Sequence, residues 1–246
     1  MSAPALRFSV DGAPVEAKAG QTIIEACDDA GIYIPRLCYR ADLPPGGQCR
    51  LCTCKVNGRY AAACVTPVTP AIAVENDTPE LRAERNTIVE MLFVEGNHPC
   101  PFCEKSGNCD LQAMAYRFGL SATELTYQFP NRDIDATHPE IFLDRNTCIL
   151  CGLCIRASRS ADGKAVFGFE NRGARTQLTV NSPDGLAGTD IATADRAAAV
   201  CPVGCIVVKG TGYETPYGER PYDRQPIGAD IEAQRHPSAE RKDADV

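Results

Sequence analysis

Fourteen cysteines in 246 residues constrain the fold of this chain more than any other feature of its sequence. The N-terminal segment, MSAPALRFSV, lacks the apolar core of a signal peptide, and no apolar run approaches the roughly 18 residues that span a bilayer. We therefore expect a cytoplasmic protein. In a reducing compartment, cysteines at this density indicate metal binding or redox chemistry instead of disulfides. The net charge of −7 also argues against a nucleic-acid partner, which normally meets a basic patch.

The N-terminal segment predicts a β-grasp ferredoxin. Residues 6–10 and 14–18 alternate apolar and polar side chains on either side of Asp11-Gly12, the pattern of a β-hairpin. Residues 21–31 (QTIIEACDDAG) then favour a short helix. A hairpin, a helix and then a cysteine loop form the opening of a β-grasp [2Fe–2S] ferredoxin.

The first cysteine set follows this helix with the spacing C-x10-C-x2-C-x11-C: Cys38, Cys49, Cys52 and Cys64. Plant-type [2Fe–2S] ferredoxins use C-x4-C-x2-C followed by a distant cysteine, so the first gap here contains an insertion. A four-cysteine zinc ribbon is the alternative. Cys54, in a strand predicted over 53–56, and Cys27, on the predicted helix, are expected to pack in the core.

The third cysteine set begins with CILCGLC at residues 148–154, the C-x2-C-x2-C opening of a [4Fe–4S] motif. Such a motif closes with a cysteine that precedes a proline. Cys201 fits this pattern, and Cys205 is the competing candidate; a zinc site is the alternative to both. We expect a small ferredoxin-like βαβ unit to return Cys201 to the triplet, with strands predicted at 165–170 and 177–181 and a helix at 192–200.

The middle set lies in residues 97–109 (NHPCPFCEKSGNC), where one histidine accompanies three cysteines: His98, Cys100, Cys103 and Cys109. Three thiolates and an imidazole also suit zinc, so spacing alone leaves both metals open. Its position between two iron–sulfur motifs favours a third electron-carrying centre, which we expect to form the middle step of the path. Helices are predicted on either side, at 83–96 and 109–119. The alternative for His98 is a hydrogen bond nearby without a bond to iron.

Three stretches together resemble a known family: GNHPCPFCEKSGNCDLQAMAYRFG, CILCGLC and AVCPVG. The family is the small diaphorase (gamma) subunit of NAD-reducing, bidirectional [NiFe] hydrogenases. That subunit is similar to the N-terminal part of the large iron–sulfur subunit of respiratory NADH dehydrogenase (complex I). The respiratory relatives place three residues between the histidine and the first cysteine. Here Pro99 alone intervenes, as in the hydrogenase-type subunits.

The resemblance covers nearly the whole chain and implies three clusters. It implies a [2Fe–2S] cluster on Cys38, Cys49, Cys52 and Cys64, a [4Fe–4S] cluster on His98, Cys100, Cys103 and Cys109, and a second [4Fe–4S] cluster on Cys148, Cys151, Cys154 and Cys201. It also implies an electron-transfer subunit of an oxidoreductase complex, without a substrate-converting site of its own.

The partners implied are a flavin- and NAD-binding diaphorase large subunit and the hydrogenase small and large subunits. FMN, NAD and the Ni–Fe centre would lie on those partners, and the whole complex would catalyse H2 + NAD+ = NADH + H+. This chain lacks a G-x-G-x-x-G fingerprint, since GTGYET (210–215) has no third glycine. The alternatives are the equivalent subunit of an NAD-dependent formate dehydrogenase or complex I-like assembly, or a zinc-stabilised interaction module.

These motifs divide an α+β chain into four parts. They are a β-grasp [2Fe–2S] ferredoxin domain at 1–78, a helical [4Fe–4S] segment with one histidine and three cysteine ligands at 79–140, a ferredoxin-like [4Fe–4S] domain at 141–210, and an extended tail or subunit-contact arm at 211–246. We expect residues 213–232 to order against a partner subunit. His138 and His236 have no cysteine neighbours in the sequence and are expected to be exposed.

Overall fold

The computed structural model describes residues 5–235. The remaining residues of the first predicted domain (1–4) and of the predicted tail (236–246), His236 among them, lie outside the described residues. Two hydrophobic cores organise the described chain. One belongs to the N-terminal sheet and its helix, and the other joins the helical segment to the C-terminal part. None of the helices within residues 5–235 is both long and apolar enough to cross a bilayer.

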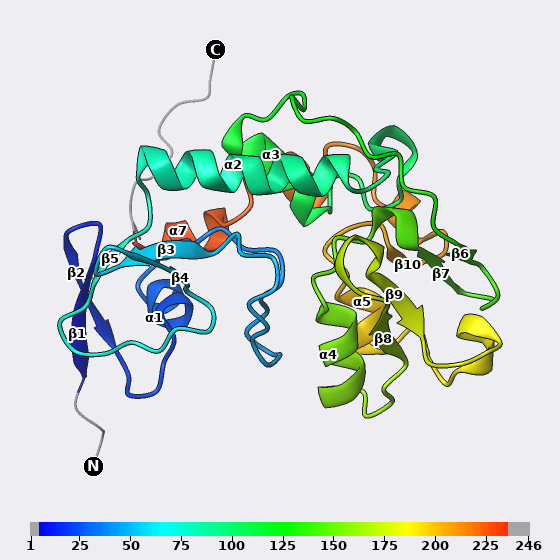
Figure 1. The fold of residues 1–246 in the computed structure, drawn as a ribbon, viewed down its shortest axis with the longest axis horizontal. Coiled ribbons are helices and arrows are strands. Elements are labelled where there is room, and N and C mark those ends of the chain that lie inside the picture. Colours follow the sequence, from blue (N-terminus) through cyan, green and yellow to red (C-terminus); the bar gives the residue numbers. More distant parts are fainter. Residues whose placement is uncertain (1–4, 236–246) are drawn as a thin grey trace.

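The N-terminal domain has the predicted β-grasp fold (Figure 1). Its sheet has the order β2-β1-β5-β3-β4, in which β1 and β2 pair antiparallel and β1 and β5 pair parallel. The strands are β1 (Leu6–Val10), β2 (Ala13–Ala17), β3 (Thr53–Val56), β4 (Arg59–Ala62) and β5 (Ala73–Glu75). Helix α1 (Ile23–Asp29) begins at a capping box, because Thr22 and Glu25 each accept the other's backbone N–H. Gly31 follows the helix with a φ of +68°, which glycine adopts without strain.

The helical segment contains α2 (Pro79–Val94), the short 3-10 helix η1 (Cys100–Phe102) and α3 (Asp110–Phe118). Helix α2 begins at Pro79 instead of residue 83, because the Thr78 side chain accepts the Leu81 N–H and a proline suits the first turn. In Figure 1, α2 runs from above the β-grasp domain toward the C-terminal part. It thereby connects the regions that contain the first and third cysteine sets.

The C-terminal part contains a three-stranded antiparallel sheet, β10-β7-β6, and a separate hairpin, β8-β9. Its strands are β6 (Ile134–Asp135), β7 (Ile141–Asp144), β8 (Phe167–Glu170), β9 (Gln177–Val180) and β10 (Ile206–Val208). Its helices are α4 (Leu153–Ser160), α5 (Arg196–Ala199) and the 3-10 turns η2 (Arg145–Thr147), η3 (Gly173–Arg175) and η4 (Gly185–Gly188).

The prediction of a βαβ unit in this part is wrong. Strands β8 and β9 pair antiparallel, since the segment between them is too short for a crossover, which takes about a dozen residues. The chain instead returns through α5 and β10, and β10 pairs antiparallel with β7. Helix α5 is shorter than the predicted 192–200 because Asp195 accepts the Ala192 N–H at 2.8 Å and forms a turn before it.

The described part of the tail folds onto the chain itself, through η5 (Thr211–Tyr213), α6 (Pro221–Arg224) and α7 (Ala229–Arg235). The Arg220 Nη1–H donates to the Ser106 carbonyl at 2.8 Å, and Arg117 Nη1–H donates to the Ile227 carbonyl, also at 2.8 Å. The tail therefore crosses the loop that carries the middle set, and its described end reaches the β-grasp domain, where a Cβ added to Gly31 would stand 2.7 Å from the Arg235 nitrogen. Its contact with a partner subunit stays a prediction.

Candidate metal centres

The first cysteine set is assembled by the loop after α1 and the segment after β4. Cys38, Cys52 and Cys64 are buried, and Cys49 is half-buried. The Cys49 N–H donates to Cys38 Sγ at 3.4 Å. Hydrogen bonds from the thiols of Cys49 and Cys64 lower the pKa of Cys38 to about 2. A hydrogen bond with Cys64 also lowers the pKa of Cys52 to about 7, so hydrogen bonds connect the four thiols of this set.

The third set lies at the start of α4. Leu150 and Gly152 both adopt left-handed backbone conformations, with φ of +52° and +65°, and these turn the triplet into a tight loop. The Leu150 N–H donates to Cys148 Sγ at 3.4 Å. Both candidates for the fourth position reach this loop. Cys201 and Cys205 are buried beside it.

Cys201 and Cys205 occupy different positions relative to the triplet. Cys201 influences the pKa of each triplet thiol, while Cys205 hydrogen-bonds to Cys148 and to Cys201. The hydrogen bond from Cys205 lowers the pKa of Cys201 to about 6. Both cysteines therefore lie close to the triplet, and Cys205 is the one that hydrogen-bonds directly to Cys148.

The middle set surrounds one small cavity between η1 and α3. The walls of this cavity include His98, Cys100, Cys103 and Cys109, the four residues that the sequence grouped together. The Lys105 N–H donates to Cys103 Sγ at 3.4 Å. Three soft sulfur donors and one imidazole thus converge on a shared space.

His98 is held by the end of α2. Its Nε2 lies 3.2 Å from the Leu92 carbonyl oxygen, and its ring packs edge-on against Phe93 with centroids 5.4 Å apart. Because a carbonyl only accepts hydrogen bonds, this contact places the proton on Nε2 and leaves the lone pair on Nδ1. Burial lowers the pKa of His98 and so favours neutral imidazole, the form that binds metals.

The three sets lie next to one another, and the third lies between the other two. The Arg156 guanidinium donates to the carbonyls of Cys38, from the first set, and Cys151, from the third, at 2.6 and 3.3 Å. On the other side, a Cβ added to Gly204 would stand 2.4 Å from Cys103 Sγ. The sequence order suggested that the middle set forms the middle step, and the structure corrects this. Folding places the loop of residues 201–205 between the middle set and the cysteine triplet at residues 148–154.

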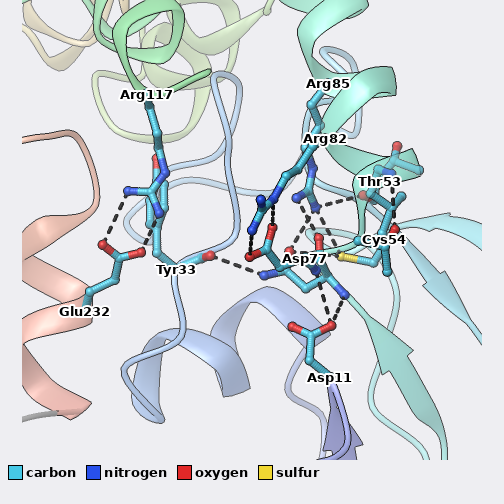
Figure 2. A network of polar contacts seen from close by, with 12 residues as sticks. Asp11, Tyr33, Thr53, Cys54, Asp77, Arg82, Arg85, Arg117 and Glu232 are labelled. Carbon is cyan, nitrogen blue, oxygen red and sulfur yellow. Dashed lines mark hydrogen bonds and ion pairs between the residues drawn. The ribbon is translucent and has the colours of Figure 1, made fainter. Parts of the chain in front are cut away.

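A polar network fastens the β-grasp domain to α2 (Figure 2). The buried guanidinium of Arg85 donates to the carbonyls of Leu51, Thr53 and Asn76 at 3.2, 3.0 and 2.7 Å. Leu51 and Thr53 flank Cys52, so this arginine supports the backbone behind the first set. One turn away, Arg82 forms an exposed bidentate ion pair with Asp77.

The remaining cysteines are core residues, as the sequence predicted. Cys27 and Cys54 are fully buried, and burial is the main cause that raises the pKa of both thiols. His138 is half-buried, contrary to the expectation of exposure, because its Nδ1 accepts the N–H groups of Glu140 and Ile141, each at 3.1 Å. Sequence reasoning missed Arg85 and Arg156, and for Arg156 the available signal was a cation two residues after a cysteine triplet.

Three regions of the chain match known families. Residues 3–79 match a 2Fe-2S iron-sulfur cluster binding domain, residues 85–124 match the NADH-ubiquinone oxidoreductase-G iron-sulfur binding region, and residues 141–208 match a 4Fe-4S single cluster domain. Each matched region contains one of the three cysteine sets. The chain thus carries both 2Fe-2S and 4Fe-4S binding domains, and the zinc alternatives are not favoured.

Relatives match over most of the chain. The gamma subunit of the NAD-reducing hydrogenase HoxS of Cupriavidus necator is 38% identical over 91% of this chain and 96% of its own length. The mitochondrial 78 kDa subunit of NADH-ubiquinone oxidoreductase of Neurospora crassa is 31% identical over 83% of this chain, which spans only 28% of that longer protein. A chain from the crystal structure of an NAD+-reducing [NiFe]-hydrogenase in the H2-reduced state is 44% identical, with a TM-score of 0.89 over 94% of this chain and 98% of that one.

Proposed function

The chain belongs to the family of NAD-reducing hydrogenase gamma subunits, and from that premise we propose that it connects a flavin- and NAD-binding diaphorase subunit to a [NiFe] hydrogenase module. Its electron-transfer role follows from the iron–sulfur domains that it shares with this family. The whole complex would catalyse H2 + NAD+ = NADH + H+. The observation that carries the proposal is the contact of three soft-donor sets with one another inside a single chain.

The donor chemistry fits one [2Fe–2S] and two [4Fe–4S] clusters. When bound, each cluster supplies a centre that accepts and releases an electron. Cysteine thiolates are the ligands that iron–sulfur clusters select, and each set supplies four soft donors. The ligands would be Cys38, Cys49, Cys52 and Cys64; His98, Cys100, Cys103 and Cys109; and Cys148, Cys151, Cys154 and Cys201.

Cys201 is the better fourth ligand of the third cluster. It precedes Pro202, as the closing cysteine of a [4Fe–4S] motif does, and its charge acts on all three triplet thiols, whereas Cys205 hydrogen-bonds to Cys148 and to Cys201. Cys205 would then donate an S–H hydrogen bond to the ligand sulfurs, a contact that tunes a cluster without replacing a ligand.

His98 fits a ligand of the middle cluster through Nδ1. Metal-binding histidines usually donate their other ring N–H to a carbonyl or carboxylate, which fixes the tautomer and the ring orientation. The Leu92 carbonyl takes this role here. A neutral imidazole in place of a thiolate removes one negative charge from the cluster, so the reduced state would be favoured and the potential raised.

The electron path would run from the first cluster through the third to the middle one, with a partner at each end. The exposed surface at the middle set supports a partner there. Phe102, between Cys100 and Cys103, is 82% exposed, and aromatic side chains are enriched in protein interfaces. The proposed domain boundaries remain 1–78, 79–140, 141–210 and 211–246. They are supported by the helix start at Pro79 and by the limits of the three matched regions.

Co-purification tests this function. A tagged chain isolated anaerobically from its native cells should bring down one partner with flavin and another with nickel. Molybdenum or tungsten without nickel would indicate the formate dehydrogenase alternative and would contradict the hydrogenase assignment. The chain matches 96% of the length of a hydrogenase gamma subunit but spans only 28% of the respiratory 78 kDa relative, and this difference favours the nickel result.

A further inference from the structure

The guanidinium of Arg156 lies between the first and third cysteine sets. This residue stands in the first turn of α4, two positions after Cys154, and is half-buried. Its Nη2–H donates to the Cys38 carbonyl at 2.6 Å, and its Nη1–H donates to the Cys151 carbonyl at 3.3 Å. One fixed positive charge therefore bridges the backbones of two ligand residues that belong to different sets.

Both loops leave room for this side chain. Gln48 Oε1 accepts a second bond from Arg156 Nη1 at 2.6 Å, which holds the guanidinium in the gap. A Cβ on Gly46 would stand 2.2 Å from Arg156 Nη1, and one on Gly152 would stand 3.3 Å from the same atom. A side chain at Gly46 or at Gly152 would therefore crowd the Arg156 guanidinium.

One donor of this guanidinium is unused. Arg156 Nε is buried and finds no hydrogen-bond partner among residues 5–235. A buried N–H without an acceptor costs free energy, so native proteins rarely keep one unless a further group satisfies it. The proposed clusters on either side offer such acceptors, because their sulfurs accept hydrogen bonds from the surrounding protein.

We propose that Arg156 tunes the first and third clusters together, as a cation that both share and as an N–H donor to cluster or ligand sulfur. The inference rests on the proposed function, since it requires both clusters to be present. Reduction adds a negative charge to a cluster. A fixed cation beside it, in surroundings less polar than water, stabilises that charge. Arg156 therefore raises both midpoint potentials together, so the difference between the two potentials changes less than either potential does.

Redox titration of the loaded protein, followed by EPR, tests this inference. In Arg156→Gln, the reduced-to-oxidised ratio of the first and third clusters at a fixed potential should fall about tenfold, equivalent to about 59 mV for a one-electron couple. Arg156→Lys keeps the charge and loses the planar fork, so it should show a smaller fall. The middle cluster, which Arg156 does not bond, should keep its ratio. Arg159→Gln is the matched control, because it removes an exposed arginine from the same helix.

The outcomes are separable. If all three clusters form in Arg156→Gln and the first and third ratios change by less than twofold, or by no more than in Arg159→Gln, the inference is overturned. If the variant loses the first and third EPR signals and keeps the middle one, a shared bridge is supported. Loss of one signal only, or of all three, overturns it. Absence of iron–sulfur signals from the wild-type chain would instead refute the proposed function.

Discussion

Gly204 lies directly against Cys103, with no room between them for a side chain: a Cβ on the glycine would stand 2.4 Å from Cys103 Sγ. The contact joins the loop that closes the third cysteine set to the loop that holds the middle set. The Asp110 N–H donates to the Pro202 carbonyl at 2.8 Å and fastens the same junction. The separation of the two proposed [4Fe–4S] clusters is therefore set by a residue that ligates neither.

Substitution of Gly204 by alanine should disturb the middle cluster most. The added methyl group must push Cys103 away, and overpacking of this kind costs about 1–3 kcal/mol. We expect the middle EPR signal to broaden or disappear while the first cluster's signal is kept. Gly168→Ala is a suitable control, since its nearest contact is the flexible end of Asn181, 3.2 Å away. An unchanged middle signal in Gly204→Ala would show that the contact is not tight.

Arg85 should be far more important for stability than its neighbour Arg82. Arg85→Met would leave three carbonyl groups, two buried and one part-buried, without this donor, at about 1–3 kcal/mol for each buried group left unsatisfied. Arg82→Met would remove only an exposed ion pair, worth about 0–1 kcal/mol. Anaerobic denaturant titration, monitored by loss of visible absorption, measures both. Equal midpoints for the two variants would rule out a structural role for Arg85 behind the first set.

His98 should affect the middle cluster through its charge. His98→Cys replaces a neutral ligand by a thiolate, so the middle cluster's potential should fall and its EPR signal should change. His98→Ala should weaken or abolish the cluster. His138→Ala controls for loss of a histidine, since that side chain only accepts bonds within its own turn. If His98→Ala kept both the potential and the EPR signal, His98 would be a hydrogen-bonding residue and not a ligand.

Cys201 and Cys205 should respond differently to the same small change. Cys201→Ser should remove the third cluster or convert its spectrum, because Cys201 is the proposed fourth ligand. Cys205→Ser should keep the cluster and shift its potential modestly, because the hydroxyl still donates a hydrogen bond to the sulfurs. The iron content and the EPR spectra of the two variants show which cysteine is the ligand. The reverse pattern would make Cys205 the ligand.

The sequence predicted what depends on local spacing. The alternation of apolar and polar residues at 6–10 and 14–18 predicted the hairpin of β1 and β2. The residues around the start of α1 predicted that helix. The sequence also predicted that His98 lies close to Cys100, Cys103 and Cys109, and all four residues line one cavity. Each of these features involves residues close together in the chain.

Long-range contacts could not be predicted in the same way. The spacing of residues 201–205 gives no sign that this loop lies between the middle set and the triplet. Arg156 and Cys38 are separated by 118 residues, and only the packing of α4 against the first loop brings them together. The βαβ prediction failed for a related reason, since apolar periodicity identified β8 and β9 without their pairing direction.

The most direct test of the account is the metal and sulfide content of the anaerobically purified chain, combined with EPR after stepwise reduction. Clusters of two, four and four iron atoms would give about ten iron and ten sulfide per chain, with one [2Fe–2S] and two [4Fe–4S] signals. The protein should be brown. A colourless protein that contains zinc in place of iron, or iron for fewer than three clusters with no third signal at any potential, would contradict it.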